Sequence, residues 1–344
     1  MKYNNLLITG GAGFIGSNLA VSFKRKYPKL KVYALDNLKR RGSELNLPRL
    51  KQNDINFIHA DIRNPEDLVL NFDLDLMIEC SAEPSVVAGL ENPPYIINTN
   101  LNGTVNCLEL CRKHKADVVF LSTSRVYPYK EINQIKIIEK ETRFEWTIKG
   151  ISEDFTTQGP KTLYGATKLS SELLLQEYIA NYGIKGVINR CGVIAGPWQF
   201  GKVDQGVFTY WMLAHYFKKP LKYIGFGGKG KQVRDLLHIE DLFSLIDIEI
   251  SQLPKVNGKI YNVGGGKEIS LSLLETTKLC QEITGNKIKI GSDLTTRLGD
   301  IKVYLSDNSK VKEELSWHPK KSAKSVLSSI FTWIRNNGRE LRNI

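Results

Sequence analysis

Length, composition and charge exclude several classes of protein. The chain has 344 residues, of which 42% are hydrophobic, so it can bury one large core or two moderate ones. No apolar run approaches the roughly 20 residues that cross a bilayer. The formal net charge of +12 favours an anionic partner, but no nucleic-acid-binding motif is present. We therefore expect a phosphorylated small molecule as ligand, and neither nucleic acid nor a membrane as partner.

The five cysteines indicate a reducing compartment, because they are odd in number and irregularly spaced. The chain opens with a predicted strand and shows no signal-peptide pattern, so the cytoplasm is the expected location. Cys107, Cys111 and His114 share one face of a predicted helix, which could suggest a metal site. The same helix is rich in apolar residues, and free cysteines are commonly buried, so we predict that no metal is bound.

Predicted strands and helices alternate along the first part of the chain, as in a doubly wound parallel sheet of the α/β class. After Arg190 glycine-rich loops break this alternation. We predict a first domain at residues 1–190 and a smaller C-terminal domain at 191–344, with some return of the chain to the first. The predicted strands are 5–9, 31–35, 55–59, 75–80, 117–122 and 185–190, the predicted helices are 14–26, 65–71, 95–114 and 163–182, and further short elements include 240–250, 270–284 and 322–337.

A glycine-rich turn directly follows the first predicted strand and precedes a predicted helix. Gly10, Gly13 and Gly16 allow the backbone to approach a pyrophosphate, which the helix N-terminus then binds. The second strand leads to Asp36, whose carboxylate can hydrogen-bond adenosine ribose hydroxyls and repel the extra phosphate of NADP. The basic residues 39–41 could accept that phosphate, but we interpret them as a solvated loop. The pattern therefore predicts NAD as the cofactor.

A Tyr-x-x-x-Lys pattern opens the predicted helix 163–182. Tyr164 and Lys168 are four residues apart, so they share a helical face. A free Tyr has a pKa of about 10, so holding a phenolate near neutral pH costs roughly 4 kcal/mol. A neighbouring ammonium and a cationic nicotinamide can supply that stabilisation. Alone the pattern is common on solvated helix faces, but beside a dinucleotide site it indicates a redox enzyme.

Together these motifs resemble the extended short-chain dehydrogenase/reductases of the NAD-dependent sugar epimerase/dehydratase type. The resemblance runs almost end to end, and it implies a Rossmann-type domain with Thr123, Tyr164 and Lys168 as catalytic triad. Tyr164 would take a proton from a sugar hydroxyl, Lys168 would bind the nicotinamide ribose, and Thr123 would hydrogen-bond the substrate oxygen. The implied cofactor-binding residues are Gly10, Gly13, Phe14, Ile15, Gly16, Asp36, Asn37, Asp61, Ile62, Asn100, Tyr164 and Lys168, with Asp61 and Ile62 at the adenine.

The residues after Thr123 bear on the type of reaction. Sugar 4,6-dehydratases of this family carry Asp-Glu there, whereas this chain has Ser124 and Arg125, which argues against dehydration. The resemblance is strongest to the CDP-paratose 2-epimerase (CDP-tyvelose 2-epimerase) branch, and it implies transient oxidation at the sugar C2 with hydride return to the other face. Oxidation at C4 followed by enolisation at C2 stays open. One departure from the family is Val193, where Asn or Ser often stands. The resembling segments are 122–127, 163–169, 189–196, 204–207 and 230–238.

The resemblance also implies a nucleotide-sugar site in which Arg234 and Arg297 grip the diphosphate through bidentate bonds. The long segment 128–162 is interpreted as lining for the sugar, or alternatively as a surface excursion. A UDP-hexose 4-epimerase would share the NAD and triad residues, whereas a non-catalytic NAD-sensing or scaffold protein would not need the triad. Family dimers imply that helices 95–114 and 163–182 pair between subunits of a homodimer or homotetramer. The implied substrate-binding residues are Ser124, Arg125, Gln205, Lys231, Gln232, Arg234 and Arg297.

Overall fold

The chain folds into two compact units, each built from several segments, in a computed structural model that describes residues 2–201 and 205–342. Unit 1 comprises Met1–Val126, Thr162–Arg190 and Phe243–Tyr261, and unit 2 comprises Tyr127–Lys161, Cys191–Leu242 and Asn262–Ile344. The functional domains expected at 1–190 and 191–344 stay a prediction. In the resembling segment 204–207, Asp204 lies outside the described residues.

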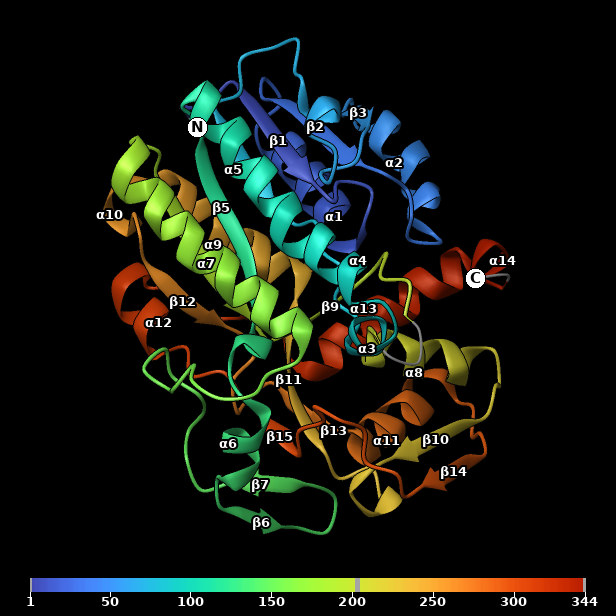
Figure 1. The fold of residues 1–344 in the computed structure, drawn as a ribbon. Coiled ribbons are helices and arrows are strands. Elements are labelled where there is room, and N and C mark those ends of the chain that lie inside the picture. Colours follow the sequence, from blue (N-terminus) through green and yellow to red (C-terminus); the bar gives the residue numbers. More distant parts are fainter. Residues whose placement is uncertain (1, 202–204, 343–344) are drawn as a thin grey trace. The chain divides into compact units, whose positions relative to one another are not determined.

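A seven-stranded parallel sheet forms the centre of unit 1, which confirms the predicted doubly wound α/β fold (Figure 1). Its strands are apolar because both of their faces are covered, and Leu6, Leu7 and Ile8 of β1 have no exposed surface. The strand order is β12–β8–β5–β4–β1–β2–β3. The bounds are β1 Asn5–Thr9, β2 Lys31–Asp36, β3 Asn56–His59, β4 Leu76–Glu79, β5 Asp117–Thr123, β8 Gly186–Cys191 and β12 Ile260–Val263.

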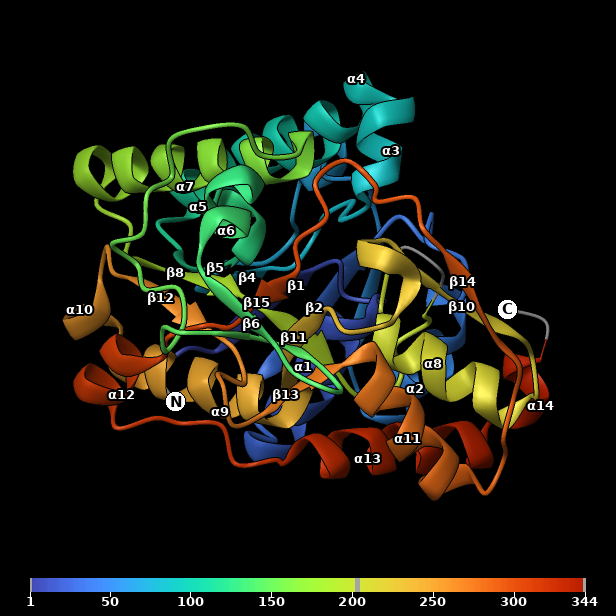
Figure 2. The same ribbon diagram turned by 90° about the horizontal axis from the view of Figure 1, so that it is seen from below.

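Helices cover both faces of this sheet. Figure 2 shows α5 (Gly103–His114) and α7 (Leu163–Tyr182) on one face, with α1 (Phe14–Lys26) and α9 (Ile239–Ser251) on the other. The predicted bounds of α1 and α7 are confirmed. Thr162 caps α7 by accepting a hydrogen bond from the Gly165 amide. The shorter helices of unit 1 are η1 Ser43–Asn46, α2 Leu47–Gln52, η2 Pro65–Leu68, α3 Val86–Glu91, η4 Ser124–Val126 and α10 Leu253–Val256.

Two predicted helices of unit 1 were wrong in detail. Residues 65–71 form only the 3₁₀ turn η2, which ends at Leu68. The predicted helix 95–114 is divided into α4 (Pro93–Ile97), a π-helical turn, η3 (Asn98–Asn102), and α5. The π turn carries Asn100, whose side-chain oxygen accepts from the Glu83 amide at 2.8 Å and whose nitrogen donates to the Glu83 carbonyl at 3.1 Å. This paired contact compensates the irregular backbone.

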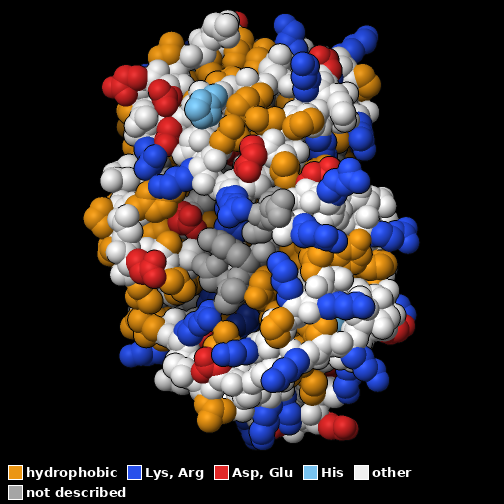
Figure 3. Space-filling view, turned by 90° about the vertical axis from the view of Figure 1, so that its right-hand side faces the viewer, with side chains coloured by type: hydrophobic (Ala, Val, Ile, Leu, Met, Phe, Trp, Pro, Cys, Tyr) orange, Lys and Arg blue, Asp and Glu red, His pale blue; other side chains and the backbone are white. Residues whose placement is uncertain are grey.

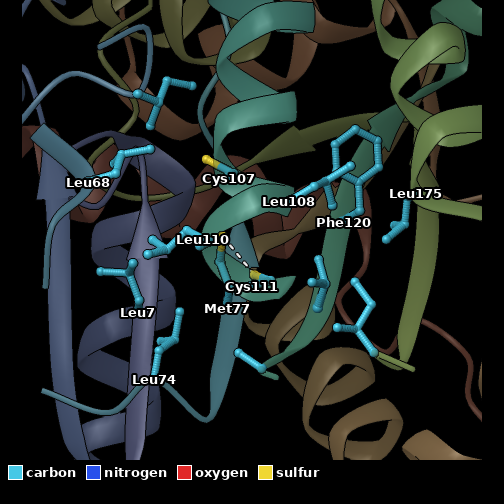
Figure 4. Close-up of a cluster of buried hydrophobic side chains, with 14 of the residues drawn as sticks. Leu7, Leu68, Leu74, Met77, Cys107, Leu108, Leu110, Cys111, Phe120 and Leu175 are labelled. Atoms are coloured by element: carbon cyan, nitrogen blue, oxygen red, sulfur yellow. Dashed lines mark hydrogen bonds between the residues drawn. The ribbon is translucent and has the colours of Figure 1, made fainter. Parts of the chain in front are cut away.

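The main core of unit 1 lies between the sheet and α5 (Figure 4). Leu7, Met77 and Phe120 project from the strands toward α5, where Cys107 and Cys111 are buried among them. The Cys111 thiol lies 3.7 Å from the Met77 sulfur. These two cysteines thus pack as apolar side chains, and the described residues contain no group of three or more potential metal ligands.

Unit 2 is built on a four-stranded sheet in which β11 pairs with β9, β13 and β15. The predicted element 270–284 begins with the strand residues 270–272 because Ser272 caps the following helix in a capping box with Glu275. The strands are β6 Ile137–Glu139, β7 Phe144–Trp146, β9 Val193–Ala195, β10 Leu221–Ile224, β11 Val233–His238, β13 Ser270–Ser272, β14 Ile290–Asp293 and β15 Val303–Tyr304. The helices are α6 Tyr129–Gln134, α8 Val207–Tyr216, η5 Phe226–Gly228, α11 Leu273–Thr284, α12 Ser309–Leu315, α13 Ala323–Asn336 and α14 Gly338–Leu341.

One face of the molecule carries many basic side chains. Figure 3 shows a face on which Lys and Arg side chains are scattered among fewer Asp and Glu side chains. Within the described ranges, no helix is both long and apolar enough to span a bilayer.

Candidate active site

The glycine-rich turn between β1 and α1 is shaped by close backbone approaches. Gly10 has a φ of +62°, a left-handed conformation that favours glycine. A Cβ on Gly16 would lie 2.2 Å from the Gly10 carbonyl oxygen, so no larger residue fits there. Gly13 is the N-cap of α1, and no side chain caps the free amides of the first turn, which includes the partly exposed Phe14 and Ile15. These unpaired amides fit a pyrophosphate at the helix N-terminus.

Asp36 stands at the end of β2, directly beside this turn. Its carboxylate accepts hydrogen bonds from the backbone amides of Ala12, at 3.1 Å, and Leu38, at 2.8 Å. Burial raises the pKa of Asp36, and the backbone donors partly offset that shift. The carboxylate is therefore fixed at the carboxyl edge of the parallel sheet, where nucleotides bind in such folds.

Asp61 follows β3 at the same edge and is held by two neighbours. The Asn37 amide donates to its carboxylate at 2.9 Å, and the Arg63 guanidinium contacts it at 2.5 Å. Hydrogen bonding by Arg63 lowers the pKa of Asp61. Ile62 is buried against Gly103, because a Cβ on that glycine would lie 2.6 Å from the Ile62 Cδ1. The structure thus brings Asp36, Asn37 and Asp61 to one edge of the sheet.

Thr123 ends β5 and is followed by the tight turn η4. Its hydroxyl oxygen accepts a hydrogen bond from the Arg125 amide at 3.2 Å. The first turn of α7 packs directly on η4, since a Cβ on Gly165 would lie 2.0 Å from the Arg125 carbonyl oxygen. This approach brings the helical turn that carries Tyr164 against the segment that begins with Ser124, although the unit 2 segment Tyr127–Lys161 separates the two regions in the sequence.

Lys168 lies one turn further along α7 and is almost fully buried. Its ammonium lies 3.3 Å from the Glu79 carboxylate at the end of β4, and 3.9 Å from the centroid of the Phe120 ring. The other Glu79 oxygen, Oε1, is buried without a hydrogen-bond partner among the described residues. Burial raises the pKa of Glu79, and the Lys168 charge opposes that rise. The ion pair fixes the ammonium at the carboxyl edge of the sheet.

A second buried ion pair supports the same elements. Glu172, one turn beyond Lys168, accepts hydrogen bonds from the Arg190 guanidinium of β8, the shortest at 2.7 Å, and from the Ser122 hydroxyl of β5. The π turn joins this framework, because the Ser171 hydroxyl donates to the Asn100 carbonyl at 3.1 Å. Asn100 therefore positions the Glu83 backbone and α7, and its side-chain amide is occupied by Glu83.

Three of the five predicted substrate residues of unit 2 lie in or just before β11. The Lys231 ammonium pairs with Glu139 at 2.7 Å, the Gln232 amide donates to the Ile224 carbonyl, and an Arg234 nitrogen donates to the Val233 carbonyl at 2.8 Å. The remaining two lie in surface segments, Gln205 ahead of α8 and Arg297 in the loop after β14, where the Arg297 amide donates to the Asp300 carboxylate. Lys231 thus has a carboxylate partner of its own within unit 2.

Sequence reasoning missed Glu79, Glu172 and Arg190 as parts of this framework. The signal for Glu79 was a carboxylate directly after the apolar run Leu76–Ile78, where a buried parallel strand ends. Its pairing with Lys168, 89 residues away, has no local signature.

The chain is similar to known proteins over nearly its whole length. A profile of the NAD-dependent epimerase/dehydratase family matches residues 6–264. The chain is 33% identical to the CDP-paratose 2-epimerase of Salmonella typhi over 95% of its length and 98% of that protein. It is 30% identical to the UDP-glucuronate 4-epimerase of Thermodesulfobacterium geofontis, over 98% of both chains.

Solved structures of similar proteins have the same fold. The UDP-glucose 4-epimerase of Thermotoga maritima, solved with UDP-glucose, superimposes with a TM-score of 0.80 at 25% identity, covering 97% of this chain and 99% of that one. The UDP-glucuronic acid 4-epimerase of Bacillus cereus, solved with UDP-glucuronic acid and NAD, gives 0.80 at 27% identity, covering 96% and 99%. The chain belongs to the NAD-dependent epimerase/dehydratase family, and it is an enzyme whose cofactor is NAD.

Proposed function

We propose that this enzyme is a nucleotide-sugar epimerase, and that its substrates are CDP-paratose and CDP-tyvelose, interconverted by inversion at C2. The observation that carries the proposal is the packing of Gly165 on η4, which joins the Tyr164 turn to Thr123 and Ser124. The similarity to the Salmonella CDP-paratose 2-epimerase, which extends over nearly the whole chain, supports the choice of substrate.

The residues of unit 1 would have separate roles in binding NAD and in proton transfer. The amides of the Gly10–Gly16 turn would hold the pyrophosphate of NAD, and Asp36 would bind the adenosine ribose. When bound, NAD supplies a reversible hydride acceptor. Tyr164 would remove the proton from a sugar hydroxyl and later return it, while Thr123 would orient the same oxygen. Lys168, held by Glu79, would keep its ammonium fixed near the nicotinamide ribose.

The residues after Thr123 favour epimerisation over dehydration. Elimination of water needs an acid and a base beside the reacting carbon atoms. Ser124 and Arg125 provide neither an acid nor a base of suitable pKa at that position. Unit 2, with Arg234 and Arg297, would bind the anionic nucleotide, and an arginine is suited to a diphosphate because its guanidinium can donate two parallel hydrogen bonds.

The experiment is incubation of the purified enzyme with CDP-paratose and, separately, with UDP-glucose, followed by proton NMR of the sugar. Inversion at C2 of CDP-paratose without added cofactor is the expected result, and a Tyr164→Phe protein should lose it while keeping its NAD. Inversion at C4 of UDP-glucose alone would instead assign a UDP-hexose 4-epimerase. NAD-containing protein with no activity on any nucleotide sugar would favour a sensing or scaffold role.

A deuterium label at C2 decides which carbon is oxidised. If C2 is oxidised, the deuterium should stay within the same sugar molecule through the inversion. Loss of the label to solvent would instead contradict hydride transfer from C2, because the C2 hydrogen would then have left as a proton.

We also propose that α5 and α7 pair between subunits of a homodimer or homotetramer. The side chains of Leu173 and Tyr182 on α7 are 58% and 53% exposed, which is unusual for large apolar groups. Analytical ultracentrifugation should show an oligomer that Leu173→Glu dissociates; a monomeric wild-type protein would contradict the pairing.

A further inference from the structure

Two cations contact one aromatic ring beside the proposed adenosine site. The Lys39 ammonium is 3.6 Å from the centroid of the Tyr95 ring, and the Arg63 guanidinium carbon is 5.4 Å from it. Both distances are within the range of a cation–π contact. Tyr95 lies in α4, where its amide is bonded to the Asn92 side chain at 3.2 Å, and it is only partly buried. We name Lys39, Arg63 and Tyr95 the cation–π cluster.

The cluster joins three chain segments at the carboxyl edge of the sheet. Lys39 lies in the loop that follows β2, three residues after Asp36, and its amide is bonded to the Asn37 side chain. Arg63 follows β3 and is anchored by the Asp61 carboxylate, which Asn37 also contacts. Tyr95 comes from α4. The cluster therefore borders the residues that would receive the adenosine ribose, and it connects α4 to the loops on both sides of them.

Lys39, the first of the basic residues 39–41, thus has a more specific arrangement than a side chain of a solvated loop. The Lys39 ammonium is positioned on the Tyr95 ring. Arg63 is paired with Asp61, and this ion pair holds its guanidinium near the ring. A cation–π contact is suited to holding two loops together, because it tolerates small displacements but is lost when the loops separate.

We propose that the cation–π cluster is a latch that retains NAD, by holding α4 and the loop after β2 together over the adenosine half of the cofactor. The latch rests on the proposed placement of NAD at Asp36. An epimerase returns its cofactor to the starting oxidation state in every turnover, so a slow release of NAD costs it nothing. The latch predicts that NAD stays bound through many catalytic cycles.

The test is the rate at which radiolabelled NAD leaves the intact enzyme when unlabelled NAD is added in excess. Tyr95→Ala should accelerate release about 5- to 30-fold, since two cation–π contacts at a partly exposed site are together equivalent to about 1–2 kcal/mol. Tyr95→Phe keeps the aromatic face and should release NAD at the wild-type rate. Lys39→Gln should accelerate release, and should add little in a Tyr95→Ala background because both changes break the same contact.

Asp36→Ala separates failure of the latch from failure of the NAD placement. Faster release from Asp36→Ala with unchanged release from Tyr95→Ala would overturn the latch and leave the placement standing. Unchanged release from both would overturn the placement and the latch with it. Thermal unfolding of the NAD-free proteins controls for misfolding, because Tyr95 is partly exposed and its truncation should lower the melting temperature little; a large decrease shared by Tyr95→Phe would assign the residue a structural role instead.

Discussion

Gly165→Ala should uncouple the catalytic helix from the Thr123 turn without disturbing the NAD loop. A Cβ at this position would lie 2.0 Å from the Arg125 carbonyl oxygen, whereas ordinary van der Waals contact begins at 3.4 Å. The two backbones must therefore separate by about 1.4 Å, the difference between these distances. A displacement of about 1 Å in a reacting group typically costs about 100-fold in rate. We expect kcat to fall at least that far, because Tyr164 is the neighbouring residue.

The assay compares kcat, bound NAD and the free energy of unfolding in the same preparations. NAD content should stay at the wild-type level, since the Gly10–Gly16 turn is formed by other elements of unit 1. Gly89→Ala is the matched control, because a Cβ on this helical glycine meets nothing closer than 3.6 Å. The control should keep its activity and, with the higher helix propensity of Ala, lose no stability.

A Gly165→Ala enzyme that retains kcat within threefold of the wild type would refute the reasoning. It would mean either that α7 can retreat without moving Tyr164 or that Tyr164 does not act in the reaction. The Tyr164→Phe protein distinguishes these possibilities, because it removes the hydroxyl without moving the helix.

The remaining predictions concern charge. Glu79→Ala should lower the free energy of unfolding by about 3–5 kcal/mol in urea titrations, because it leaves the Lys168 ammonium buried without its partner. A Glu79→Leu/Lys168→Met double variant should recover most of this loss, and equal stability of the single and double variants would contradict the account. Burial raises the pKa of Glu249 from 4.5 to about 8, so the folded protein holds a proton that the unfolded chain has released, and stability should fall as the pH rises from about 4.5 to 8. Glu249→Gln should therefore be more stable than the wild type by a few kcal/mol at pH 8 and similar at pH 4.5, and a parallel pH dependence of the two urea midpoints would count against this. Arg234→Ala should weaken binding of CDP about 10- to 100-fold by calorimetry and spare NAD, whereas an equal loss of both affinities would make the arginine structural.

Much of the fold of unit 1 could be predicted because its elements carry local signals. The apolar run of β1, the glycine turn and the bounds of α1 and α7 all follow from neighbouring residues. The predicted helix 95–114 was wrong in its first half, because the π turn there is compensated by the contact between Asn100 and the Glu83 backbone, 17 residues away. No helical periodicity reports a contact of that kind. By contrast, the capping box of Ser272 and Glu275 is a local signal that would have placed the start of α11.

The electrostatics of the candidate site also depend on a contact between residues that are distant in the sequence. The sequence places Tyr164 and Lys168 on one face of a helix, and it suggests an isolated ammonium beside the phenol. In the structure Lys168 forms an ion pair with Glu79, and the Glu79 charge offsets part of the electrostatic effect of the ammonium on neighbouring groups. A phenolate on Tyr164 therefore gains less from Lys168 than a lone ammonium would give it. Other contacts must supply a larger part of the roughly 4 kcal/mol, and the positively charged nicotinamide of bound NAD is the cation suited to do so. The nicotinamide can do so only when the phenol is correctly placed, and the close approach of Gly165 to the η4 turn would set that position.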